Sequence, residues 1–183
     1  MGLVTLFVAG IAAAYAKRAA TATENQLRPW IAVNGVQTVE GVGITTPKGF
    51  YADATGFTVA IVNSGASPAV NMRTNWTVRA VPKDDPVPPM EVDPQDEMRG
   101  VLLAKEPTLL TPLFLSDEET QIYRRRQVKA VIYVKITYQS PFTPRKTHVT
   151  EACYEAFHGG AIGQRQGDAP QQYRPTGPQN QMT

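Results

Sequence analysis

The chain has 183 residues, 42% hydrophobic and 19% charged, and its 18 basic and 16 acidic side chains leave a formal net charge of +2. A charge this close to balance argues against a strongly basic nucleic-acid-binding protein. The single cysteine, Cys153, excludes an internal disulfide framework, and two histidines, His148 and His158, exclude most multi-histidine metal sites. We therefore expect one domain with appendages, no cofactor and no nucleic-acid partner.

Residues 2–16 form an apolar run without a charged side chain, and Lys17 and Arg18 follow it directly. The run is shorter than the roughly 20 apolar residues of a usual membrane span, but it lacks the polar face of a core helix. We expect a membrane anchor over residues 1–16, flanked by Lys17 and Arg18. Two alternatives stay open, an ordinary core helix and a secretory signal cleaved near Ala16, although a signal normally carries its basic residues before the apolar stretch.

The basic residues also predict an orientation. Lys17, Arg18 and Arg28 all follow the apolar run, and such residues beside a membrane segment prefer the cytoplasmic side. We therefore expect a single-pass protein whose C-terminal domain is cytoplasmic. Residues 17–27 are rich in alanine and long polar side chains, which predicts a helical stalk that ends before Pro29.

From residue 28 to residue 158 the dominant pattern is period two, which is typical of strands with one buried and one wet face. Pro112 interrupts one of these stretches, which favours an edge strand. Glu151 interrupts the alternation of another, and a bulge would restore it. Six stretches are predicted as strands: residues 30–39, 57–62, 70–80, 108–115, 128–139 and 147–157.

Turns and one helix separate the strands. Ser116 and Glu119 have the spacing of a capping box, and the basic triplet Arg124, Arg125 and Arg126 complements the other end of the predicted helix dipole. Short strands with one connecting helix predict a mainly β, antiparallel β-sandwich over residues 28–158. A tight reversal (residues 63–68), a proline-rich loop (82–89), one or two helical turns (93–99), a hairpin loop (140–145) and a disordered tail (159–183) complete the expected organisation.

Three groups of residues carry a resemblance: Arg28-Pro29-Trp30-Ile31, the turn in residues 62–71, and residues 136–138 through 148–150 to Cys153. In these pieces the chain resembles a group of uncharacterised bacterial single-pass membrane proteins with a short helical stalk. The resemblance covers about residues 1–157 and implies that the β-sandwich is immunoglobulin-like. The hairpin at residues 140–144 departs from the shorter glycine-containing turn of that group, and the first segment is shorter than its anchor. The resemblance brings no catalytic residues.

Catalytic chemistry is not indicated by the spacing of reactive residues. Cys153 and His148 are five apart on one predicted strand, which places them on opposite faces, so we expect Cys153 to be a small buried hydrophobe and His148 to lie at the strand surface or a loop edge. The acidic groups at residues 84–85 and 93–97 lack the spacing of a calcium loop. Arg124, Arg125, Arg126 and Lys129 form the one charge cluster of interest, which either complements the helix end or contacts anionic lipid or an acidic partner.

These observations lead to one expected function and two rivals. We expect a membrane-anchored, non-enzymatic interaction module, held in the lipid bilayer by its N-terminal helix, with a protein partner that the sequence does not name. The first rival is a secreted or periplasmic sandwich that binds a ligand or joins an assembly after signal cleavage near Ala16. The second is an enzyme whose site is assembled from loops.

Overall fold

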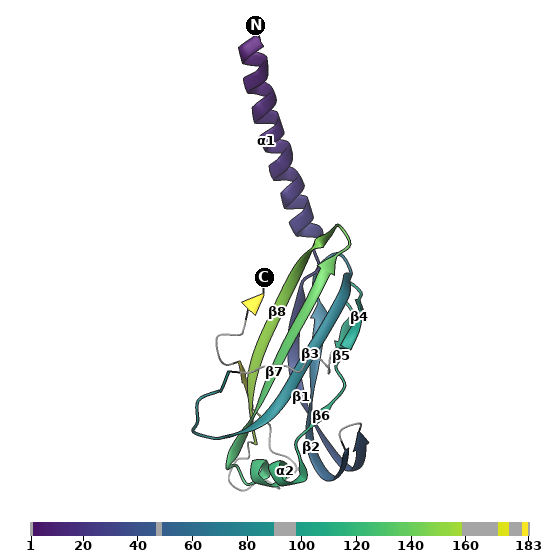
Figure 1. Ribbon diagram of the computed structural model, residues 1–183, viewed down its shortest axis with the longest axis vertical. Helices are drawn as coiled ribbons and strands as arrows, with labels where there is room; N and C mark the ends of the chain where they lie inside the picture. The colour runs from purple at the N-terminus through teal and green to yellow at the C-terminus, as the bar shows by residue number, and fades with distance from the viewer. Residues whose placement is uncertain (1, 47–48, 90–97, 159–171, 176–180, 183) are drawn as a thin grey trace.

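The computed structural model describes residues 2–46, 49–89, 98–158, 172–175 and 181–182. Figure 1 shows a long β body from one end of which a single helix projects. The helices are α1 (Gly2–Leu27) and α2 (Asp117–Arg124). The strands are β1 (Ile31–Thr46), β2 (Gly49–Asn63), β3 (Ala69–Pro82), β4 (Met98–Leu102), β5 (Pro107–Leu109), β6 (Leu113–Phe114), β7 (Val128–Ser140), β8 (Thr143–Phe157), β9 (Gln172–Pro175) and β10 (Gln181–Met182).

The strands form two antiparallel sheets. In the first, β2 lies between β1 on one side and the short strands β5 and β6 on the other. In the second, the order is β10-β8-β7-β3-β4, and β9 also pairs with β8. The predicted mainly β, antiparallel architecture is therefore confirmed.

A hydrophobic core lies between the two sheets because alternate residues of their strands face inward. Trp76 of β3 is 5% exposed, and Phe57 of β2 and Ile132 of β7 are fully buried in the same cluster. Tyr123 of α2 joins this core with its ring edge-on to Phe57, at 5.8 Å between centroids. The helix thus closes the end of the sandwich that lies away from α1 (Figure 1).

Most of the predicted strands are confirmed, but several are longer than predicted, and β2 and β8 begin at Gly49 and Thr143. Pro112 separates β5 from β6, and both short strands pair with β2, as an interrupted edge strand should. The opening strand does not end at residue 39 but continues to Thr46 as one long hairpin with β2. The bulge suggested by Glu151 is wrong, because the β7–β8 register is unbroken from Ala130↔Ala156 to Gln139↔Thr147. Glu151 instead pairs across the strands with Lys135, at 2.9 Å.

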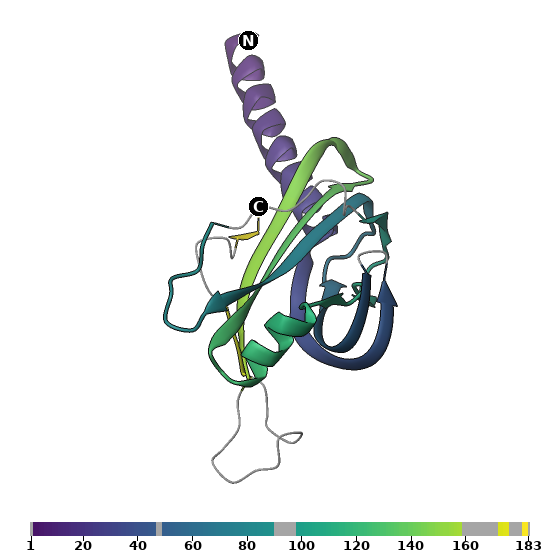
Figure 2. The same ribbon diagram turned by 60° about the horizontal axis from the view of Figure 1, so that its bottom comes forward.

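The N-terminal segment is one unbroken helix, so no break separates the expected anchor from the expected stalk. The side chains of residues 13–23 are exposed, and both views show α1 running away from the β body (Figures 1 and 2). Residues 13–16 of the apolar run are therefore not part of the core. Within the described residues, no helix combines the length and hydropathy needed to cross a bilayer.

Two parts of the C-terminal region belong to the second sheet. Gln172–Pro175 pairs with Tyr154–Phe157, and Gln181–Met182 pairs with the β8 residues Thr150 and Glu151. The expectation of a disordered tail does not hold for these two segments; residues 159–171, 176–180 and 183 lie outside the described part of the chain. Residues 93–97 of the expected helical turns also lie outside it, whereas Arg99 is in β4.

Candidate functional site

Hydrogen bonds fix both ends of helix α2, and the sequence predicts those at its N-terminal end. Ser116 and Glu119 form the expected capping box, in which Glu119 N donates to Ser116 Oγ at 3.2 Å and Ser116 N donates to Glu119 Oε2 at 2.9 Å. At the other end Arg126 N donates to Tyr123 O and Gln127 N to Ile122 O, which is the Schellman pattern. The positions of the three arginines are therefore set by a well-defined helix end.

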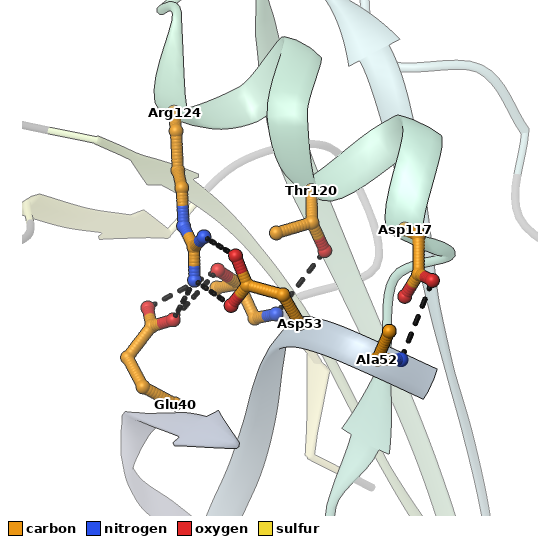
Figure 3. A network of polar contacts seen from close by, with 7 residues as sticks. Glu40, Ala52, Asp53, Asp117, Thr120 and Arg124 are labelled. Atoms are coloured by element: carbon orange, nitrogen blue, oxygen red, sulfur yellow. Dashed lines mark hydrogen bonds and ion pairs between the residues drawn. The ribbon is translucent and has the colours of Figure 1, made fainter. Parts of the chain in front are cut away.

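Polar contacts hold α2 on the β1–β2 hairpin, as Figure 3 shows. The buried backbone N of Thr55 donates to Thr120 Oγ1 at 3.1 Å, and the backbone N of Ala52 donates to Asp117 Oδ2 at 3.3 Å. These bonds satisfy backbone donors of a strand edge that α2 covers.

Arg124 is engaged within the chain. Its Nη1 lies 2.5 Å from Asp53 Oδ2, and its Nη2 lies 3.0 Å from Asp53 Oδ1 and 2.6 Å from Glu40 Oε2 (Figure 3). The hydrogen bond from Arg124 lowers the pKa of Asp53, and the bonds to the two carboxylates raise the pKa of Arg124. Such a two-pronged pair is geometrically specific, so the guanidinium holds α2 against the hairpin.

Lys129 is also bound internally. Its side chain is 6% exposed, and its Nζ lies 2.7 Å from Glu155 Oε1 and 2.7 Å from the backbone oxygen of Asp85. The predicted basic cluster is therefore divided, since Arg124 and Lys129 contact groups of their own domain and only Arg125 and Arg126 are exposed.

The location of this cluster also bears on its role. The α2 end of the β body is opposite the end that carries α1 (Figure 1). Lys17 and Arg18 are exposed on α1 itself, within the segment that follows the apolar run. A bilayer that held α1 would thus be remote from Arg125 and Arg126, and the lipid-contact interpretation of the triplet does not fit this arrangement.

The possible nucleophile and its possible base do not meet. Cys153 pairs with Tyr133 on the outer face of the second sheet, whereas His148 pairs with Tyr138 on the inner face. Burial, together with the nearby Glu155 charge, raises the pKa of Cys153 to about 11, so the thiolate is disfavoured. The buried, hydrophobic role expected for Cys153 is confirmed. The surface position expected for His148 is wrong: it is 2% exposed and its ring lies 5.5 Å from that of Tyr138.

Among the described residues, the second sheet carries a polar hollow that no local sequence pattern predicts. It lies over β4, β3, β7 and β8 and has a volume of about 810 Å³. Arg73 of β3 and Arg99 of β4 are directly opposite each other in the register, and Thr137 of β7 is opposite Arg73 on the other side. The register thus brings two guanidinium side chains to the same place on the sheet. The hollow is lined by Asn71, Met72, Arg73, Arg99, Gly100, Val101, Thr137, Gln139 and Thr147.

A bulge in β3 shapes this hollow. The register of β3 shifts between Val70 and Arg73 against β7, and Asn71 at the shift has a positive φ of 49°. Asparagine is one of the few residues that adopt this conformation readily. The side chain of Asn71 donates to Gln139 Oε1 at 2.6 Å. The arrangement offers guanidinium, amide and hydroxyl groups, which suit a carboxylate or another anion.

Comparisons with known proteins add no further assignment. No family model, curated protein or solved structure matches the chain. Among the described residues, no group of three or more histidine, cysteine, aspartate or glutamate side chains is arranged to hold a metal ion.

Proposed function

We propose that this protein is a non-enzymatic interaction module that its N-terminal helix anchors in a membrane as a single-pass protein. The observation that carries the proposal is the course of α1, which leaves the β body as one helix and does not pack on its core (Figure 1). Its residues 2–16 are an apolar sequence. An apolar helix that projects from its domain is stabilised by other apolar surroundings, and lipid supplies them.

We further infer that the β-sandwich is immunoglobulin-like. The two sheets have the orders β1-β2-β5 and β8-β7-β3-β4, apart from the C-terminal strands. An immunoglobulin domain pairs its strands A, B and E in one sheet and its strands G, F, C and C′ in the other. The strands of this chain take these places in sequence order, with α2 in the connection between β6 and β7. This order supports the inference.

The polar hollow is the surface that we assign to the partner of the module. Arg73 and Arg99 face each other across β3 and β4 there, and the chemistry of the hollow favours an acidic protein segment. Anchoring raises the effective concentration of such a domain at the membrane, so a weak contact is sufficient. Crosslinking from native membranes should capture a partner with the wild-type protein and lose it with Arg73→Glu/Arg99→Glu. Arg79→Glu, an exposed arginine on the same strand, is the matched control.

Fractionation tests the anchor itself. The full-length chain should stay with membranes after carbonate extraction and enter solution only with detergent. Amino-terminal sequencing of the recovered protein distinguishes the secreted alternative, because a new terminus after Ala16 would indicate signal cleavage. Recovery of the uncleaved chain in the soluble fraction after gentle lysis would overturn the proposal.

The positions of Lys17, Arg18 and Arg28 support a cytoplasmic β body. Gln121 is exposed on α2, and the native Cys153 is buried, so Gln121→Cys adds one accessible thiol. An impermeant maleimide should leave this thiol unlabelled in intact cells and label it after permeabilisation. Labelling in intact cells would reverse the orientation without affecting the anchor.

A further inference from the structure

The turn between β7 and β8 presents an exposed aromatic side chain at the α1 end of the body. β7 ends at Ser140 and β8 begins at Thr143, so Pro141 and Phe142 form the tip. Phe142 is 58% exposed. Its backbone N donates to Ser140 Oγ at 3.3 Å, which holds the turn. In both views this tip lies beside the end of α1 that joins the β body (Figures 1 and 2).

Basic side chains are present at the same end of the body as this aromatic tip. Arg145 and Lys146 follow it on β8, and both are exposed. Lys105, in the connection from β4 to β5, is held at the same end, because its backbone N donates to Asn63 O at 2.7 Å and its Nζ donates to Ser64 O. The neighbouring Leu103 is 56% exposed. The α1 end of the body thus combines exposed apolar side chains with basic ones.

The opposite end is mixed in charge, because Arg124, Arg125 and Arg126 lie there among five carboxylates. The first turn of α2 carries Asp117, Glu118 and Glu119, and the adjoining hairpin carries Glu40 and Asp53. That end also has an exposed aromatic residue, Phe50, which is 67% exposed near the β1–β2 turn. Exposed aromatics are thus present at both ends, but at the α2 end the carboxylates outnumber the basic side chains, which disfavours contact with anionic lipid.

We propose that the α1 end of the β body rests on the anionic surface of the bilayer, with Phe142 at the headgroup level and Arg145 and Lys146 against lipid phosphates. The inference rests on the proposed anchor. Aromatic side chains favour the membrane–water boundary, and clustered basic residues are drawn to anionic headgroups. At 1.5 Å per residue, residues 17–27 separate the body from the apolar run by about 16 Å. Because the tip lies to one side of α1, tilt of the helix toward it lowers the tip to the headgroups.

The test uses the full-length protein in vesicles and a matched site at each end. Phe142→Cys and Phe50→Cys, each combined with Cys153→Ala, are labelled with the environment-sensitive fluorophore NBD. Vesicles contain phosphatidylcholine alone or phosphatidylcholine with 30% phosphatidylserine. We expect a blue-shifted, brighter emission at position 142 in the anionic vesicles only, and water-like emission at position 50 in both.

Charge reversal then tests which basic residues are responsible. Arg145→Glu/Lys146→Glu should abolish the blue shift at position 142, whereas Arg125→Glu/Arg126→Glu at the far end should leave it unchanged. Water-like emission at position 142 in chains that float with anionic vesicles would overturn this inference and leave the anchor intact. An equal shift in both kinds of vesicle would overturn recognition of anionic lipid. Failure of the wild-type chain to float with any vesicle would instead refute the anchor.

Discussion

Gly65 lies so close to the backbone of Arg28 that a Cβ at this position would be 2.4 Å from the Arg28 carbonyl oxygen. It would also lie 2.6 Å from Trp30 N and 2.7 Å from the Cα of Pro29. The turn after β2 thus packs tightly against the residues that directly follow α1. Asn63 fixes this contact, because its Oδ1 accepts from the backbone N of both Trp30 and Gly65. The position of α1 on the β body therefore depends on this turn.

Gly65→Ala should destabilise the protein by about 1–3 kcal/mol, because the atoms in its way are backbone and cannot turn aside as a side chain can. Gly35→Ala is the control, since no atom lies within 4 Å of a Cβ built there. Chemical unfolding in detergent, followed by tryptophan fluorescence, measures both. Equal stabilities of the two variants would show that the contact at Gly65 is relaxed without cost.

Local sequence patterns predicted much of this fold, and long-range pairing determined what they missed. The alternation along residues 70–80 and the capping box at Ser116 depend on neighbours in the chain, and the structure confirms both. The burial of His148 depends on its pairing with Tyr138 in a specific register. No local pattern around residue 148 encodes that register.

The candidate sites show the same limit. In the sequence Arg124 belongs to a basic triplet, but its carboxylate partners Glu40 and Asp53 are 84 and 71 positions away. Arg73 and Arg99 are far apart in the chain and become opposite only through the register of β3 with β4. Charge clusters along a sequence therefore did not predict the charge clusters on the folded surface.

Removing one partner of the buried ion pair between Lys129 and Glu155 should cost much more stability than removing one partner of a more exposed pair. Glu155→Leu leaves a buried ammonium without its carboxylate, which should cost about 3–5 kcal/mol. The double variant Lys129→Met/Glu155→Leu should recover most of this loss. Lys135 and Glu151 form the partly exposed comparison, with side chains 42% and 23% exposed, and Glu151→Leu should cost less than Glu155→Leu. Denaturant midpoints of the four proteins check this; a double variant as unstable as Glu155→Leu would contradict it.

Replacing each of two neighbouring arginines at the end of α2 by glycine should change the stability of the protein in opposite directions. Arg126 has a φ of 63°, in the left-handed region, whereas the C-cap Arg125 has a φ of −77°. Glycine is favoured at position 126, where φ is positive, and costs conformational entropy at position 125. We expect Arg126→Gly to stabilise the protein by about 0.5–1 kcal/mol and Arg125→Gly to destabilise it by a similar amount. Thermal unfolding of both variants gives the signs, and a shared sign would refute the role assigned to φ.

His158 should make the protein less stable in mild acid. Burial lowers the pKa of His158 below its ordinary value of 6.5, and the charges of Arg126 and Arg124 lower it further, against an opposite effect of Glu40. Tyr123 packs on the same ring, at 5.6 Å between centroids. The unfolded chain therefore binds this proton at a higher pH than the folded chain, and the free energy of unfolding falls as the pH drops below about 6.5.

Unfolding curves between pH 7.5 and pH 5 test this dependence. His158→Gln should flatten the slope in that range, because the variant has no proton to bind at this position. Asp53→Asn should not affect that range, since the hydrogen bond from Arg124 lowers the pKa of Asp53 below 3.8 and its contribution is lost only in stronger acid. A slope that persists in His158→Gln and disappears in Asp53→Asn would assign the acid sensitivity to the ion pair that holds α2 on the hairpin.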